Sequence, residues 1–151
     1  MWNSKKKAMT FSYDDGVSQD IRLIDIFNKY GLKGTFNLNS ELLGVNPFLI
    51  REEGKVTHYK NKPEDLRYIY DGHEVAAHTL THPFLPDLPD DEIIRQVEQD
   101  RLNLSELVGY EVCGFAYPCG SPINDPRTIE VLRQKTGVKY ARTEETTLRF
   151  T

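Results

Sequence analysis

The chain has 151 residues, of which 38% are hydrophobic, so it can bury one core, and we expect a single domain over residues 1–151. Its 19 Lys and Arg residues against 23 Asp and Glu give a net charge of -4, and the basic residues form no long block apart from Lys5 to Lys7. No apolar run approaches the ~18 residues that a membrane span needs, and no signal-peptide core follows Met1. These features exclude nucleic acid and a membrane as expected partners and predict a cytoplasmic protein.

Cys113 and Cys119 are the only two cysteines of the chain. They lie six residues apart in one segment that is expected to be extended, so their Cα atoms should be too far apart for a disulfide. Two free thiols also fit a reducing compartment.

The first half of the chain alternates strand and helix patterns. A strand that ends at an Asp-Asp-Gly turn is followed by apolar residues at helical spacing, with Ser18 as the predicted cap and Gly31 at the end of the helix. The predicted elements of this half are a strand at 7–13, a helix at 18–31, a strand at 33–38, a long irregular connection at 39–61 and a short helix at 63–70.

The second half continues the alternation. Three prolines between residues 83 and 89 predict a loop, and Asp90 is the predicted cap of the longest amphipathic helix, which ends at Gly109. The predicted elements of this half are a short buried strand at 75–77, a helix at 90–109, a strand at 113–117, a helix at 125–137 and a strand at 138–141.

Strands that alternate with helices predict an α/β fold with a parallel sheet and right-handed crossovers. In such folds the chemistry lies at the carboxyl ends of the strands. Three separated stretches fall at predicted strand ends and should therefore meet at one end of the sheet. They are Asp14 with Asp15, His78 with His82, and the turn at 118–120.

His78 and His82 are four residues apart. Pro83 biases His82 towards extended geometry and allows about one helical turn between the histidines, and one turn rises only ~5–6 Å, which brings both imidazoles within reach of one ion. Two histidines cannot fill the shell of a divalent metal, so at least one further ligand is needed, and the Asp14-Asp15 pair is the obvious source of a carboxylate.

Three motifs carry a resemblance to a known family. Residues 10–16 (TFSYDDG), 78–82 (HTLTH) and 115–120 (FAYPCG), in this order and spacing, resemble the first three motifs of the polysaccharide deacetylases, carbohydrate esterase family four. The resemblance extends from about Lys7 to about Arg142. It implies a distorted (β/α) barrel of the polysaccharide deacetylase type and metal-dependent removal of acetyl groups from an N-acetylated carbohydrate, which is the expected substrate.

By position, the resemblance implies that Asp15, His78 and His82 are the metal ligands and that Asp14 is the catalytic base. It also implies that the backbone N–H of Cys119 is the oxyanion donor. Zinc is the first choice of metal, with cobalt, manganese and nickel as alternatives, since the ligands are nitrogen and oxygen donors.

These roles agree with the chemistry of the residues. A bound divalent ion lowers the pKa of a water, and Asp14, next to the ligand but not needed in the shell, can take a proton from that water. Pro118 rigidifies the turn that presents the Cys119 N–H, and Gly120 permits unusual backbone dihedrals there. Three further residues are expected to line a sugar subsite, namely Tyr13, Tyr117 and Pro118.

The chain departs from the family pattern in two respects. Ala116 stands where many members carry an arginine that braces the base, so Asp14 either lacks this partner or finds another. The four histidines all lie in the first 82 residues, so the acid histidine of the later motifs has no counterpart.

The five predicted strand-helix units are also about two short of the barrel, at ~30 residues a unit. We therefore expect a barrel that is incomplete at the C-terminus of this chain. Its open edge should favour self-association.

Two other functions were considered. The first is a metal-binding but catalytically impaired relative that binds carbohydrate, which Ala116 and the missing acid favour. The second is a non-haem iron oxygenase with two His ligands and one carboxylate. That class is disfavoured because its acid usually lies two residues from the first His, whereas Asp15 lies 63 residues before His78.

Overall fold

The computed structural model describes residues 9–52, 54–119 and 125–144. Five strands form one sheet, and each neighbouring pair is parallel. In their order across the sheet these strands are β1 (Ser12–Asp14), β2 (Thr35–Leu38), β5 (Glu74–Ala77), β6 (Gly114–Ala116) and β7 (Tyr140–Arg142). The predicted parallel sheet is therefore confirmed; β2 and β6 are shorter than predicted, whereas β5 begins one residue earlier.

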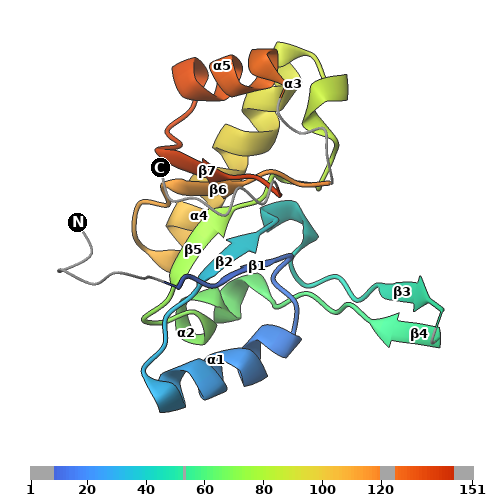
Figure 1. The fold of residues 1–151 in the computed structure, drawn as a ribbon, viewed down its shortest axis with the longest axis vertical. Coiled ribbons are helices and arrows are strands. Elements are labelled where there is room, and N and C mark those ends of the chain that lie inside the picture. Colours follow the sequence, from blue (N-terminus) through green and yellow to red (C-terminus); the bar gives the residue numbers. More distant parts are fainter. Residues whose placement is uncertain (1–8, 53, 120–124, 145–151) are drawn as a thin grey trace.

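Helices follow the strands and cover one face of this sheet (Figure 1). The apolar residues of the strands pack against them, and the largest buried side chains include Phe36, Leu38, Val75 and Phe115. The helices are α1 (Gln19–Tyr30), α2 (Leu66–Ile69), α3 (Asp90–Ile94), α4 (Asp100–Val108) and α5 (Pro126–Lys135), with short 3-10 turns η1 (Ser40–Leu42), η2 (Pro63–Asp65) and η3 (Leu85–Asp87). In the part of the chain that the structure describes, no helix is long and apolar enough to cross a membrane.

The period of two along each strand separates a helix-covered face from an inner face. Tyr13 lies on the covered face, where its ring centroid is 6.0 Å from that of Phe27 in α1. Asp14, the next residue, therefore points to the inner face. The strand register places Asn37, Ala76 and Gly114 in the same inner row as Asp14.

The sheet is strongly curved towards its inner face. Its two edge strands, β1 and β7, are separated by three other strands, yet the Arg142 guanidinium donates hydrogen bonds to Asp14 at 2.5 and 2.6 Å. Side chains on opposite edges can meet in this way only if the sheet curls. The described strands thus form an open half-barrel, which agrees with the fold class that the sequence predicts.

The segment 39–61 was predicted to be irregular, and this prediction is wrong. It holds an antiparallel pair, β3 (Phe48–Arg51) and β4 (Gly54–Thr57), which projects from the body of the molecule (Figure 1). Two further backbone bonds, from His58 N to Pro47 O at 3.0 Å and from Lys60 N to Val45 O at 2.9 Å, extend the pairing to 45–51 and 54–60, which we call the ribbon. Neither β3 nor β4 has a buried face, so these strands show no alternation of apolar and polar residues.

Smaller differences concern helix ends and the proline loop. The predicted helix at 90–109 contains a π-helical stretch, η4 (Arg95–Gln99), between α3 and α4, and Pro89 rather than Asp90 is its N-cap residue. Ser18 occupies the N-cap of α1, but its side chain makes no capping bond. The loop at 83–89 includes the 3-10 turn η3. Both cysteines are free, as predicted.

A buried polar network fixes α1 to α2 and to the base of the ribbon. The Tyr70 hydroxyl donates to Asp20 Oδ2 at 2.7 Å, and Asn61 Nδ2 donates to the Tyr70 hydroxyl at 2.9 Å. Burial raises the pKa of Asp20 to about 6, although the hydroxyl donor and Lys60 oppose the shift. Ionised Asp20 therefore lowers the stability of the folded chain.

A raised folded-state pKa stabilises the protein below the unfolded pKa, and this contribution is lost as the pH rises through about 6. We expect Asp20→Asn, which still accepts the Tyr70 hydrogen bond, to remove this loss. Between pH 4 and pH 7 the free energy of unfolding of the wild type should fall relative to that of Asp20→Asn by ~1–3 kcal/mol in urea titrations. Asp25→Asn, at an exposed position of the same helix, is the control. Parallel pH profiles for wild type and Asp20→Asn would contradict the assignment.

Candidate metal and catalytic site

Unusual backbone conformations gather at one end of the sheet. Among the described residues, the non-glycine positions with positive φ are Asp15 (81°), Thr79 (70°), His82 (62°) and Cys119 (62°), which follow β1, β5 and β6. Such conformations cost ~1–3 kcal/mol each and persist where the surrounding structure enforces them. Cys119 itself is thus in the left-handed region, while Gly120, for which unusual dihedrals were expected, lies outside the described residues.

Asp15, His78 and His82 lie together at this end of the sheet. Each offers one ligand atom, and these atoms all lie within 4.8 Å of one another, an arrangement that could hold a metal ion. The expected path between the histidines is wrong, however. His82 is not extended and not one helical turn away; it has φ 62°, and its N–H donates to Thr79 Oγ1 at 3.0 Å.

Hydrogen bonds orient both imidazoles. His78 Nδ1 lies 2.8 Å from the Ala116 carbonyl oxygen, so Nδ1 carries the proton and the Nε2 lone pair is left for a ligand. Burial lowers the pKa of His78, which favours the neutral ring that binds metal. His82 directs Nε2 towards Asp15, at 4.0 Å from Oδ1, while its Nδ1 lies 3.7 Å from Cys119 Sγ. The donor set therefore fits a divalent ion.

A buried carboxylate supports the histidine loop from behind. Asp100 in α4 is fully buried, and its two oxygens accept the backbone N–H of His78 at 2.9 Å and that of Ser40 at 2.7 Å. Asn39 Nδ2 donates to the carbonyl oxygens of His78 and Thr79 at 2.5 and 2.9 Å. The sequence alone gives no sign of these residues, because a polar residue in a helix or loop is ordinarily solvated, and only the tertiary structure buries them.

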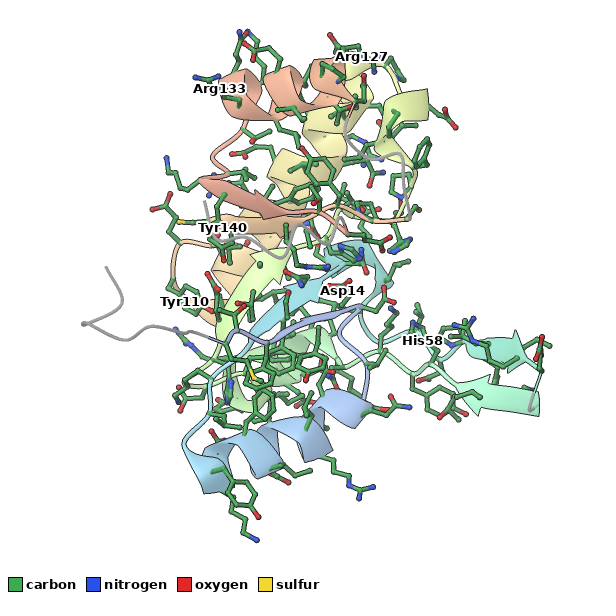
Figure 2. All side chains as sticks on the ribbon, viewed as in Figure 1. Asp14, His58, Tyr110, Arg127, Arg133 and Tyr140 are labelled. Carbon is green, nitrogen blue, oxygen red and sulfur yellow. The ribbon has the colours of Figure 1, made fainter. Side chains whose placement is uncertain are left out.

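The base of the ribbon brings two more nitrogen groups to Asp15. Lys60 Nζ lies 3.1 Å from Asp15 Oδ1, and His58 Nε2 lies 3.2 Å from Oδ2. Figure 2 shows His58 where the ribbon joins the body of the molecule. Burial alone would raise the pKa of Asp15, but Lys60 and the two site histidines hold it below its usual value. Neither His58 nor Lys60 lies in a motif, so the sequence alone gives no sign that either residue contacts Asp15.

Asp14 points into the site from β1 and has two partners. Arg142 donates to both carboxylate oxygens, and Asn37 Nδ2 donates to Oδ1 at 2.7 Å. Arg142 is paired in register with Ala116, so the arginine that the family motif would carry on β6 stands beside that position on β7. Asp14 therefore has an arginine partner although position 116 carries alanine.

The residues expected to line a sugar subsite occupy different surroundings. Tyr13 packs against Phe27 and Phe36, and Tyr117 is buried with its ring 5.0 Å from that of Phe115. A groove of about 460 Å³ opens instead beside Asp15, between the site and the ribbon. Neither tyrosine lines this groove, and a substrate contact by Tyr13, Tyr117 or Pro118 stays a prediction.

The curved parallel sheet thus carries at its strand ends a His-His-Asp group that could hold a divalent ion. The family model for polysaccharide deacetylases matches residues 2–141. The chain therefore belongs to the polysaccharide deacetylase family, whose members are hydrolases with a (β/α) barrel fold.

Individual relatives are distant. Peptidoglycan-N-acetylglucosamine deacetylase PgdA of Listeria monocytogenes is 24% identical over 120 residues, which are 78% of this chain and 22% of the relative. The Streptococcus pyogenes deacetylase PplD, solved with acetate, has a TM-score of 0.70 at 20% identity and covers 89% of this chain and 55% of its own. For a polysaccharide deacetylase from Bacillus cereus the TM-score is 0.73 at 18% identity, with 93% and 41% covered. This chain thus spans about a fifth of the curated relative and about half of these solved chains.

The arrangement of ligand atoms generates a prediction about metal content. After loading with zinc and dialysis, we expect Asp15→Ala, His78→Ala and His82→Ala each to lose the bound ion, because each removes one of three donors. Asp14→Asn should keep it. Metal analysis of the four variants measures this directly, and loss of zinc from Asp14→Asn with retention by Asp15→Ala would mean that the two aspartates have exchanged roles.

Proposed function

We propose that this protein is a metal-dependent hydrolase that removes acetyl groups from an N-acetylated carbohydrate. The observation that supports this best is the position of Asp14. It lies next to the Asp15, His78 and His82 group but is held apart from it by Arg142 and Asn37. One carboxylate can thus serve the ion while the other stays available as a base.

In this proposal Asp15, His78 and His82 hold a divalent ion, zinc in the first instance and otherwise cobalt, manganese or nickel. Such an ion supplies Lewis acidity and lowers the pKa of a water at the site. Asp14 accepts a proton from the attacking water, and its two donors keep the carboxylate oriented for that transfer. The Cys119 N–H donates to the oxyanion that forms from the acetyl carbonyl, at a turn whose backbone is held in a rare conformation.

The Cys119 side chain has a passive role in this scheme. Burial raises the pKa of the thiol, so the thiol stays protonated beside His82. Its Sγ lies 3.7 Å from the His82 carbonyl oxygen, where it packs against the ligand loop.

The other two functions are less well supported. A catalytically impaired relative was favoured by Ala116, but Arg142 now braces Asp14 from the neighbouring strand. Membership of a family of carbohydrate deacetylases favours hydrolysis over the oxygen chemistry of a non-haem iron enzyme.

The first test removes the base. Asp14→Asn should abolish acetate release from N-acetylglucosamine oligomers, a loss of ~10²–10⁴-fold or more in kcat, because an amide cannot accept the proton. Zinc content should equal that of the wild type. Turnover by Asp14→Asn near the wild-type rate would exclude Asp14 as the base.

The second test concerns Arg142. Arg142→Ala should lower kcat by ~10–10²-fold with little change in zinc content, because Asp14 keeps only the Asn37 bond and loses its orientation. The register offers a matched rescue: Ala116→Arg in the Arg142→Ala background returns a guanidinium to the paired position on β6. Acetate release that is unaffected by Arg142→Ala would show that the pair serves the fold and not the reaction.

A further inference from the structure

The ribbon has two distinct faces. One face carries Phe48, Ile50 and Lys55. Phe48 and Ile50 are two residues apart in β3, and Lys55 is the partner of Ile50 on β4. The Lys55 ammonium lies 3.7 Å from the centre of the Phe48 ring, so the cationic and aromatic groups of this face already contact each other. The period of two turns Leu49 and Arg51 to the opposite face.

This opposite face continues into the metal and catalytic site. Two backbone bonds, from His58 N to Pro47 O and from Lys60 N to Val45 O, carry the antiparallel pairing down to the base of the ribbon. His58 and Lys60 both contact Asp15 there. The groove of about 460 Å³ therefore has the ribbon as one wall, and it is lined by Asp15, Leu42, Val45, Pro47, Leu49, Arg51, His58, Lys60 and His82.

The charge of the groove differs from that of the whole chain. The chain carries a net charge of -4, whereas the lining residues include two permanent cations, Arg51 and Lys60, and one carboxylate, Asp15. Lys60 already neutralises Asp15. Within the described residues, Arg51 has no carboxylate within ion-pair distance, so its guanidinium is available to a ligand.

The distance along the ribbon sets the size of that ligand. Arg51 pairs with Gly54, four residues from His58, which corresponds to ~13 Å of extended chain. This span is longer than one pyranose ring. Between the two ends lie apolar side chains, Val45, Pro47 and Leu49, which suit the C–H faces of sugar rings.

We propose that the groove binds an N-acetylated oligosaccharide that carries a carboxylate on a sugar beyond the one being deacetylated, and that Arg51 recognises this carboxylate. This inference rests on the proposed function, since it places the acetylated sugar at the Asp15, His78 and His82 group. Arg51 presents a planar donor fork that matches a carboxylate, and a half-open groove lets the pair form without full desolvation of either charge.

Binding to the zinc-loaded chain in the Asp14→Asn background tests the inference without turnover. The probes are the tetrasaccharide of N-acetylglucosamine and a tetrasaccharide of equal length in which every second sugar bears a lactyl ether carboxylate. By titration calorimetry we expect the carboxylated probe to bind about three- to tenfold more tightly at low salt, and less so at 0.5 M salt, as for a partly exposed ion pair.

Arg51→Glu and Arg51→Gln should abolish this preference and leave the affinity for the neutral probe within about twofold. Lys55→Glu makes the same charge change as Arg51→Glu on the other face of the ribbon and should keep the preference. Equal affinity of the two probes, or a preference that survives both Arg51 substitutions, would overturn the inference while acetate release by the wild type upholds the proposed function. A preference that depends on Arg51 in a wild type that releases no acetate would support the Arg51 contact and reject the deacetylase.

Discussion

The curvature of the parallel sheet is the constraint on which the rest of the structure depends, and the contact between Arg142 and Asp14 spans the curve. This contact joins the two edge strands of a five-stranded sheet across the inner face, and it is a charge-assisted pair with short donor distances. Small inner residues make the approach feasible. A Cβ at Gly114 would lie 2.3 Å from the Tyr140 hydroxyl, which reaches over β6 to donate to Glu74. The curvature of the sheet thus brings the arginine to Asp14, and the absence of bulk in the middle strands leaves room for this approach.

The backbone is strained at the end of the sheet where the site lies. Buried polar groups hold it in these strained conformations. Asp15, Thr79, His82 and Cys119 adopt left-handed conformations, which would relax in an unsupported loop. Asp100, which accepts two backbone N–H groups, lies behind the loop that starts at His78. These contacts thereby hold Asp15, His78 and His82 in fixed relative positions.

The ribbon adds side chains to the site that do not come from the ends of the parallel strands. Its base is fixed to the turn after β1, where Asn61 N donates to Gly16 O at 2.8 Å and Ser18 N donates to Tyr59 O at 2.7 Å. Gly16 has φ 63°, and a Cβ there would lie 2.9 Å from Leu38, so the turn is closed to larger residues. Lys60 and His58 therefore reach Asp15 from a segment that contains no family motif.

The sequence by itself determined the alternation of strands and helices, the family, and the meeting of Asp14, Asp15, His78 and His82, because these features depend on local periodicity and on motifs of fixed spacing. It did not determine the partners that lie far apart along the chain. Arg142 reaches Asp14 only through the curvature of the sheet, which no local pattern encodes, and Ala116 alone left open whether Asp14 has an arginine partner. The ribbon was missed because a two-stranded element with both faces exposed shows no periodic burial, so only the tertiary structure decided that His58, Lys60 and Arg51 line the site.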